Sequence, residues 1–181
     1  MNMTLQERYR KEIVPQLQHD LELRNAMSVP RVKKVVINVG VGKHHAEPKF
    51  IETVERSLVS ATGQKPILTV ARKSIASFKI REGMTVGVVV TLRGRRMWDF
   101  IEKLIHAALP RIRDFRGISL TAVDGRGNLS LGFREHIVFP EIRADEIEVV
   151  HGLQVTIVSD AQSYEKGLAL FRALGLPFKK K

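Results

Sequence analysis

The feature of this sequence that most restricts its fold is the alternation of apolar and polar residues in four separate segments. In residues 84–93, every second position from Met84 to Leu92 carries an apolar side chain. Successive side chains of a strand point to opposite faces, so this pattern predicts a strand with one buried face. The same alternation runs through residues 32–42, 129–134 and 153–158. Together the segments predict a sheet with one apolar and one polar face.

Most of the remaining apolar residues recur at helical spacing. Thr4 and Glu7 have the spacing of a capping box, which predicts a first helix that runs to about Leu23 and is kinked near Pro15. A proline in the first turn and a glycine after the last turn mark a second helix. The other expected elements are helices at 48–62, 95–109 and 159–174, a strand at 66–71, and loops at 72–83 and 111–126.

Strands and helices do not alternate strictly along the chain. We therefore expect an α+β fold with a mostly antiparallel sheet, helices packed on one face and an open polar face. The only division that the sequence suggests is a hinge between Arg81 and Met84. It separates an N-terminal half, 1–83, from a C-terminal half, 84–181, which holds the central strand, the long loop and the C-terminal helix. We expect the two halves to form one compact unit.

The chain carries a large excess of positive charge. It has 30 lysines and arginines against 19 acidic residues, a formal net charge of +11, while its hydrophobic content of 44% is ordinary for a globular protein. Nucleic acid is the commonest partner of such a chain, because neutralised phosphates release their counterions. Charge that only maintains solubility is one alternative. An anionic membrane surface is a weaker one, since no helix pairs a basic face with a strongly apolar face.

Several classes of function lack the residues they need. The sequence has no cysteine, which excludes disulfides and thiolate chemistry and fits a reducing compartment. Its histidines lack metal-site spacing, so we expect no metal or other cofactor. Gly40 and Gly42 follow a strand, but His45 and His44 stand where a dinucleotide fingerprint and a phosphate loop need other residues. Without a signal peptide or membrane-length apolar run, we expect a soluble, cytoplasmic protein that is not an enzyme.

The polar face of the predicted sheet carries short hydrogen-bonding groups and glycines. Such a face allows a sugar–phosphate backbone to approach closely, and Arg93 and Arg134 supply charge for phosphates. It lacks the aromatic residues that stack single-stranded bases, so we expect recognition of folded RNA by shape. An ordinary solvated sheet face is the alternative. The other residues of this face are Asn38, Gly40, Gly42, Thr85, Gly87, Val89, Thr91, Asn128, Ser130, Gly132, Gln154 and Thr156.

Two loops are rich in cations. Residues 71–83 hold four cations and one anion with serines between them, and residues 110–117 hold three arginines. Either loop is also compatible with a simple solvated role. The apolar residues of the second loop suggest a protein contact as readily as an RNA contact.

Seven short motifs along the chain have a familiar order and spacing. They are VVINVGVG (35–42), TGQKP (62–66), KSIASFKIREG (73–83), VTLRG (90–94), ALPRIRDFRG (108–117), DGRGN (124–128) and FPEI (139–142). This set closely resembles the bacterial family of large-subunit ribosomal protein five, the 5S rRNA-binding protein of the central protuberance. The resemblance covers essentially the whole chain.

The resemblance implies a structural constituent of the large ribosomal subunit that binds 5S rRNA and helps attach it to 23S rRNA, beside other 5S-associated large-subunit proteins. It places the 5S contact on the polar sheet face. On this interpretation the N-terminal half, 1–83, holds 5S-binding strands and the first basic loop, and the C-terminal half, 84–181, holds the rest. The implied 5S-binding residues are Asn38, Gly40, Gln64, Thr91 and Arg93.

The resemblance also assigns the two basic loops. The first matches a segment that contacts P-site tRNA, with Arg72, Lys73, Ser74, Ser77, Lys79 and Arg81 as the implied contact residues. The second matches a region that forms an intersubunit bridge with small-subunit protein thirteen, through Arg111, Arg113 and Arg116.

Three positions depart from the pattern of the family. Val123 stands where phenylalanine is common, Leu129 where tyrosine is common, and Gln154 where aspartate is frequent. All three lie in the second half of the chain, so they bear on the bridge and the long loop more than on the 5S contact.

Overall fold

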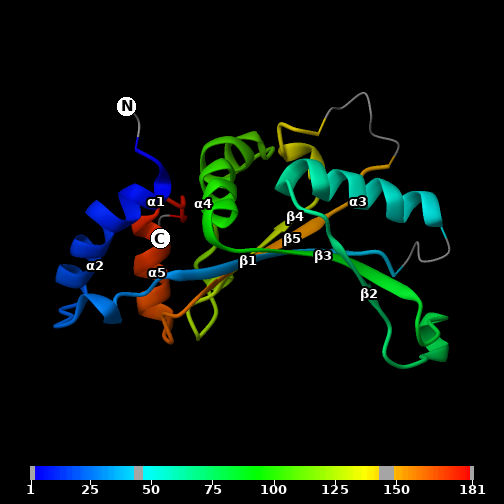
Figure 1. The fold of residues 1–181 in the computed structure, drawn as a ribbon, viewed down its shortest axis with the longest axis horizontal. Coiled ribbons are helices and arrows are strands. Elements are labelled where there is room, and N and C mark those ends of the chain that lie inside the picture. The colour runs from blue at the N-terminus through cyan, green and yellow to red at the C-terminus, as the bar shows by residue number, and fades with distance from the viewer. Residues whose placement is uncertain (1–2, 43–46, 143–148, 180–181) are drawn as a thin grey trace. The chain divides into compact units, whose positions relative to one another are not determined.

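The computed structural model describes residues 3–42, 47–142 and 149–179 (Figure 1). Five strands form one antiparallel sheet, in the order β2-β3-β1-β5-β4, and the expected α+β class is confirmed. The alternating segments all lie in strands, as does the short segment before the first basic loop. The strands are β1 (Val32–Gly40), β2 (Ile67–Val70), β3 (Thr85–Leu92), β4 (Leu129–Phe133) and β5 (Leu153–Ser159).

The helices follow the predicted ranges closely, with one exception. They are α1 (Leu5–Arg8), α2 (Val14–Asp20), α3 (Pro48–Thr62), α4 (Gly94–Lys103) and α5 (Tyr164–Ala173), with π-helical turns at Tyr9–Ile13 and Leu104–Ala108. Single 3₁₀ turns occupy Ala26–Ser28, Ala76–Phe78, Leu109–Arg111, Leu120–Ala122 and His136–Val138.

The exception is α5, which begins five residues later than the expected start at Ser159. Ser159 is the last residue of β5, and its hydroxyl donates to the carbonyl of Gly127 instead of capping a helix. Ser163 is the actual cap, because its side chain accepts a hydrogen bond from the backbone N–H of Lys166. The prediction placed the start of the helix at Ser159 because a serine directly before an apolar run is a common N-cap.

The expected kink near Pro15 takes the form of a widened turn. Residues Tyr9–Ile13 are π-helical, and the N–H of Val14 bonds to the carbonyl of Tyr9. Proline has no N–H to donate to the preceding turn, and the π-helical turn directly before it accommodates the missing hydrogen bond.

Tyr9 is held by contacts on two sides. The centroid of its ring lies 5.0 Å from that of Trp98, and its hydroxyl donates to the carbonyl of Pro30 at 2.9 Å. Burial, with Asp160 second, raises the pKa of Tyr9 to about 12.

The residues group into two compact units, each built from separate stretches of chain. The first comprises residues 1–35, 93–131 and 156–181, and the second comprises residues 36–92 and 132–155. The predicted division into halves at residues 83 and 84 stays a prediction.

Helix pairs hold the first unit together. Helix α1 packs on α4, where the N–H of Leu5 donates to the carboxylate of Glu102 at 3.3 Å, and α2 packs on α5. The loop before β4 packs on α5 through two glycines, Gly127 and Gly167. Gly127 also has a φ of +80°, a conformation that favours glycine.

The contact between the two glycines leaves no room for a side chain. A methyl group on Gly167 would lie 2.7 Å from the carbonyl oxygen of Gly127. We expect Gly167→Ala to lower the free energy of unfolding by about 2–3 kcal/mol, measured by urea denaturation. Gly125→Ala is the matched control, because a methyl group there meets nothing within 4 Å. Equal stability of the two variants would contradict this packing.

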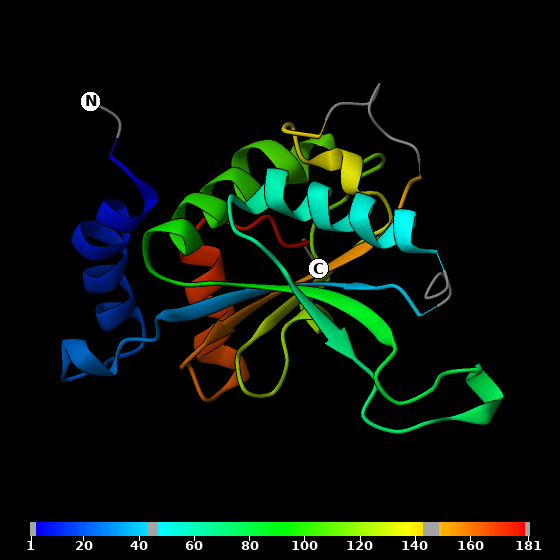
Figure 2. The same ribbon diagram turned by 45° about the vertical axis from the view of Figure 1, so that its right-hand side comes forward.

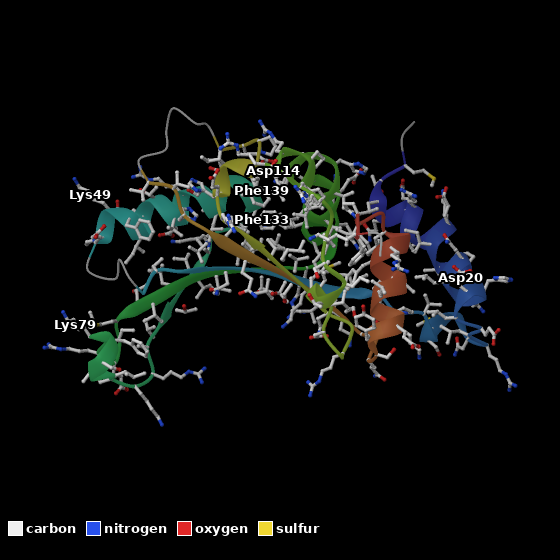
Figure 3. The ribbon with its side chains drawn as sticks, turned by 180° about the vertical axis from the view of Figure 1, so that it is seen from behind. Asp20, Lys49, Lys79, Asp114, Phe133 and Phe139 are labelled. Carbon is white, nitrogen blue, oxygen red and sulfur yellow. The ribbon has the colours of Figure 1, made fainter. Side chains whose placement is uncertain are left out.

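In the second unit, α3 lies along one side of β1, β2 and β3 (Figure 2). Phe50, Val54 and Leu58 are the buried residues on its inner face, and Gly63, with a φ of +65°, ends the helix. The rings of Phe133 and Phe139 meet at 6.0 Å on the same side of the strands as α3 (Figure 3). The apolar side chains of β1 and β3 that point to this side therefore pack in a core.

Two histidines stack inside the second unit. The rings of His136 and His151 are 4.0 Å apart and 3° from parallel, and both residues are buried. Nδ1 of His136 accepts a hydrogen bond from the N–H of His151 at 3.3 Å, while Nε2 of His151 is buried without a partner among the described residues. Burial, and then the neighbouring His136, lower the pKa of His151 to about 4. Burial also lowers the pKa of His136.

This pair makes stability fall as the pH falls. The unfolded chain takes up the protons near pH 6.5, whereas the folded chain resists them, so stability is complete above that pH and is lost towards pH 4. We expect His151 to account for a loss of about 2 kcal/mol between pH 7 and pH 5, measured by urea denaturation at several pH values in that range. His151→Gln should flatten this dependence, and the exposed control His106→Gln should preserve it. A dependence of equal steepness in both variants would contradict the assignment.

Candidate nucleic-acid interface

The open face of β1 and β3 holds most of the predicted 5S-binding residues. Ile37 and Val39 of β1 and Val88 of β3 have exposed fractions of at most 1%, whereas Asn38 and Thr91, which alternate with such residues, are partly exposed. The predicted assignment of faces is confirmed for these residues. Gly40 ends β1 and is exposed, as is Arg93, one residue beyond β3.

The buried list of β3 is shorter than predicted. Met84 and Val86 belong to it by alternation, but both are only partly buried. They lie at the start of the strand, next to β2, whose apolar side chains are themselves largely exposed. Alternation gives the direction of a side chain but does not show whether a neighbour covers it.

Gln64 contacts strand β3 from outside the sheet. It follows the left-handed turn at Gly63, and its Nε2 donates to the backbone carbonyl of Thr91 at 3.1 Å. Gln64 and Thr91, 27 positions apart in sequence, are thus brought together. Asn38, Gly40, Gln64 and Thr91 belong to the second unit, whereas Arg93 begins a segment of the first.

The first basic loop forms a small hairpin beyond the ends of β2 and β3. Ile75 and Ile80 pair as an isolated bridge, and Lys79 lies at the tip with a φ of +53° (Figure 3). The hydroxyl of Ser74 accepts a hydrogen bond from the N–H of Glu82 at 2.9 Å, which braces the hairpin. The six predicted contact residues are all exposed: Arg72, Lys73, Ser74, Ser77, Lys79 and Arg81.

Sequence reasoning missed the apolar part of this loop. Ile75 and Phe78 are 46% and 68% exposed, so they line the outside of the hairpin rather than a core. An apolar residue in a loop is normally assigned to packing, and only its exposure in the structure shows otherwise. The loop therefore offers apolar and aromatic surface among its cations.

The second basic loop keeps its three arginines in solvent. Arg111, Arg113 and Arg116 are exposed, while Ile112 and Phe115 between them are partly buried. The end of the loop is fixed by the C-terminal segment, where Ile118 bonds to Pro177 and Lys179 bonds back to Ile118. The arginines thus project from a loop with an anchored end.

Polar residues also line β4 and β5 on the side predicted to be open. Ser130 and Gly132 are exposed on β4 and Gln154 on β5, and the hydroxyls of Ser130 and Thr156 are 3.2 Å apart. Arg134 is exposed just beyond β4. Gln154 is the exposed departure from the family pattern.

The other two departures are partners in the core. Val123 and Leu129 pair as a bridge, and they are 5% and 0% exposed. Each of these residues is smaller than the aromatic residue that is common at its position in the family. Because the two are paired, the losses of side-chain volume at the two positions lie next to each other. The loop between them is held by Asp124, whose carboxylate accepts hydrogen bonds from Arg126 and Asn128.

Within ranges 3–42, 47–142 and 149–179, no group of three histidine or acidic side chains is placed to hold a metal ion. No helix in these ranges is long and apolar enough to cross a membrane. Lys43, His44 and His45, next to the incomplete nucleotide motif, lie outside the described residues.

Two family models match most of the chain. Residues 25–81 match the model for ribosomal protein L5, and residues 85–178 match that for the C-terminus of the ribosomal L5P family. Curated relatives named large ribosomal subunit protein uL5 match it over almost their full lengths. They include those of Halothermothrix orenii (52% identical, covering 96% of this chain and 97% of the relative), Chloroflexus aurantiacus (51%, 99% and 99%) and Parasynechococcus marenigrum (53%, 97% and 98%).

The fold, the polar sheet face and these matches define the class of the protein as a structural ribosomal protein of the large subunit. The chain belongs to the ribosomal protein L5 family. The predicted resemblance and the prediction of a non-enzymatic role in translation are thereby confirmed.

Proposed function

We propose that the chain binds 5S rRNA through the open face of β1 and β3 and helps attach it to 23S rRNA in the central protuberance, among other 5S-associated proteins. The observation that carries this proposal is the one-sided burial of the two strands. Ile37, Val39, Val88 and Val90 are buried. Asn38 and Thr91 remain accessible, and Gln64 is held against Thr91. Membership of the L5 family supports it.

The charge of the chain supplies the long-range part of the binding. Arg93 lies in extended conformation (φ −140°, ψ 166°) directly after Thr91 and Leu92, and its side chain is exposed. A guanidinium there can form charge-assisted hydrogen bonds with a phosphate, and each neutralised phosphate steepens the dependence of affinity on salt. Neutral neighbours such as Thr91 add hydrogen bonds with little salt dependence.

Arg93→Gln should weaken 5S rRNA binding about tenfold and reduce the slope of log affinity against log salt by about one, because one phosphate contact is lost. Thr91→Ala should weaken binding about three- to tenfold with the slope unchanged and the fold intact. Filter binding over a salt series measures both. Lys49→Gln removes an exposed cation from α3, across the sheet from the proposed face, and serves as control (Figure 3). Affinity that does not change with salt would refute the electrostatic part of the proposal.

The first basic loop is proposed to contact P-site tRNA. Its cations are exposed on a braced hairpin beyond the ends of β2 and β3, and its exposed Phe78 adds a surface for stacking. These two roles are separable, because the loop extends beyond the ends of β2 and β3 (Figure 2).

The double variant Lys73→Gln, Lys79→Gln should reduce chemical protection of P-site tRNA in reconstituted ribosomes while leaving the affinity for 5S rRNA unchanged. The matched control removes the same charge from α3, by Lys49→Gln with Arg56→Gln, and should keep the protection. Unaltered tRNA protection in the loop variant would remove the loop from this role.

The second basic loop is proposed to form the bridge with small-subunit protein thirteen. Three exposed arginines with two partly buried apolar residues between them suit a protein surface that offers both acidic and apolar groups. The anchored end of the loop lowers the entropy that such a contact must overcome.

A further inference from the structure

We propose that the outer edge of β2 (Ile67–Val70) is a docking site for a short, extended, acidic peptide, which pairs with β2 and adds a further strand to the sheet. The site lies within the second unit. It is separate from the open face of β1 and β3, and the proposal does not depend on the contact with 5S rRNA.

Strand β2 lies at the border of the sheet. It is the first strand in the order β2-β3-β1-β5-β4, so among the described residues it has a strand neighbour on one side only. Alternate residues of such an edge strand point their backbone N–H and C=O groups outwards. An extended peptide can pair with these groups, which is a common mode of peptide recognition.

The side chains of β2 are apolar and exposed on both faces of the sheet. Ile67 is paired with Val89, on the open face, and is 72% exposed. Leu68 is paired with Val88, on the side of α3, and is 43% exposed, while Val70 is 54% exposed. Edge strands commonly carry a charged residue that discourages pairing, and β2 has none. A strand laid along β2 therefore covers apolar surface on both faces.

Cations flank this apolar edge at both ends. Lys65 lies before the strand, Arg72 and Lys73 follow it, and all three are exposed. Residues 63–83 contain five lysines and arginines but one acidic residue, Glu82. Acidic side chains at the ends of a docked peptide are therefore attracted, whereas basic ones are repelled.

The same charges disfavour a second copy of this chain as the occupant. Two β2 strands paired antiparallel bring Lys65 of each copy towards Arg72 and Lys73 of the other, so like charges meet at both ends. The register of β2 on β3 also shifts between Thr69 and Val70, and such an irregularity bends a strand and shortens the length available for pairing. A short peptide fits this edge better than a strand of a folded copy.

The probe is a fluorescein-labelled peptide of three glutamates followed by Val-Thr-Val-Thr-Val, with an amidated C-terminus. Its binding to the full chain is measured by fluorescence anisotropy. In an antiparallel arrangement its glutamates lie near Arg72 and Lys73. We expect saturable binding that weakens as salt is raised, and that weakens about tenfold when the glutamates are replaced by lysines.

Methylated peptides test the strand pairing itself. Methyl groups on the backbone nitrogens of the valines block one edge of the peptide, and methyl groups on those of the threonines block the other. Only one of the two peptides should lose affinity, because one edge pairs with β2 while the other faces solvent. Equal affinities of the two methylated peptides would overturn the proposal, since attraction by charge alone has no preferred edge.

The apolar part of the site is tested by Ile67→Thr with Val70→Thr. This double variant removes exposed apolar surface, keeps β-branched residues and should weaken peptide binding about tenfold. Val150→Thr is the matched control, because Val150 is 50% exposed and lies outside β2, and it should leave the affinity unchanged. If the double variant does not fold, the methylated peptides still decide with the wild-type chain.

The charged part is tested by Arg72→Gln with Lys73→Gln. This variant should weaken peptide binding about fivefold and flatten its salt dependence. The matched control removes two exposed cations from α3, by Lys49→Gln with Arg56→Gln, and should bind as the wild type does. Equal weakening in both variants would overturn the assignment of the cations beside β2.

Two other occupants give different results. A free chain that sediments as a dimer, and as a monomer after Ile67→Thr with Val70→Thr, assigns the edge to a second copy and overturns the proposal. A loss of affinity for 5S rRNA in the same double variant, with peptide binding unchanged, assigns the edge to RNA and also overturns it.

Discussion

The structure depends on the burial of one face of its strands and the exposure of the other. In the second unit, α3 covers the side of the strands to which Ile37, Val39, Val88 and Val90 point. Each of these side chains contributes about 1.5–3 kcal/mol by leaving water. A slip of one residue in the register of either strand would expose these residues and bury Asn38 and Thr91. The same free energy that folds the unit therefore also orients its hydrogen-bonding groups towards a partner.

Much of this arrangement follows from local patterns in the sequence. Period-two alternation located the strands and gave the faces of Asn38 and Thr91, and Pro48 and Gly63 marked the ends of α3. The late start of α5 was missed because two serines compete as caps, and only the contact of Ser159 with Gly127 decides between them. Local sequence patterns predict an element correctly when interactions within that segment determine it. They fail when a contact with a residue distant in the sequence determines where the element begins.

The candidate site shows the same boundary between local and distant information. The family resemblance supplied Gln64, but its hydrogen bond to the carbonyl of Thr91 depends on how α3 returns to the sheet. Net charge indicated a nucleic-acid partner, whereas the faces of the strands indicated which polar residues such a partner could reach.

The first unit is built from three separate stretches of chain, and this affects how it can fold while the chain is being synthesised. The unit draws on three stretches of chain, and its contact between Gly127 and Gly167 joins the loop before β4 to the last helix. A growing chain that has not yet released residues 156–179 from the exit tunnel lacks β5 and α5, so the unit cannot close. Until then α1 and α4 present apolar faces without their full set of neighbours, in a cation-rich chain surrounded by RNA. The interval before release is thus when this protein is most exposed to premature association.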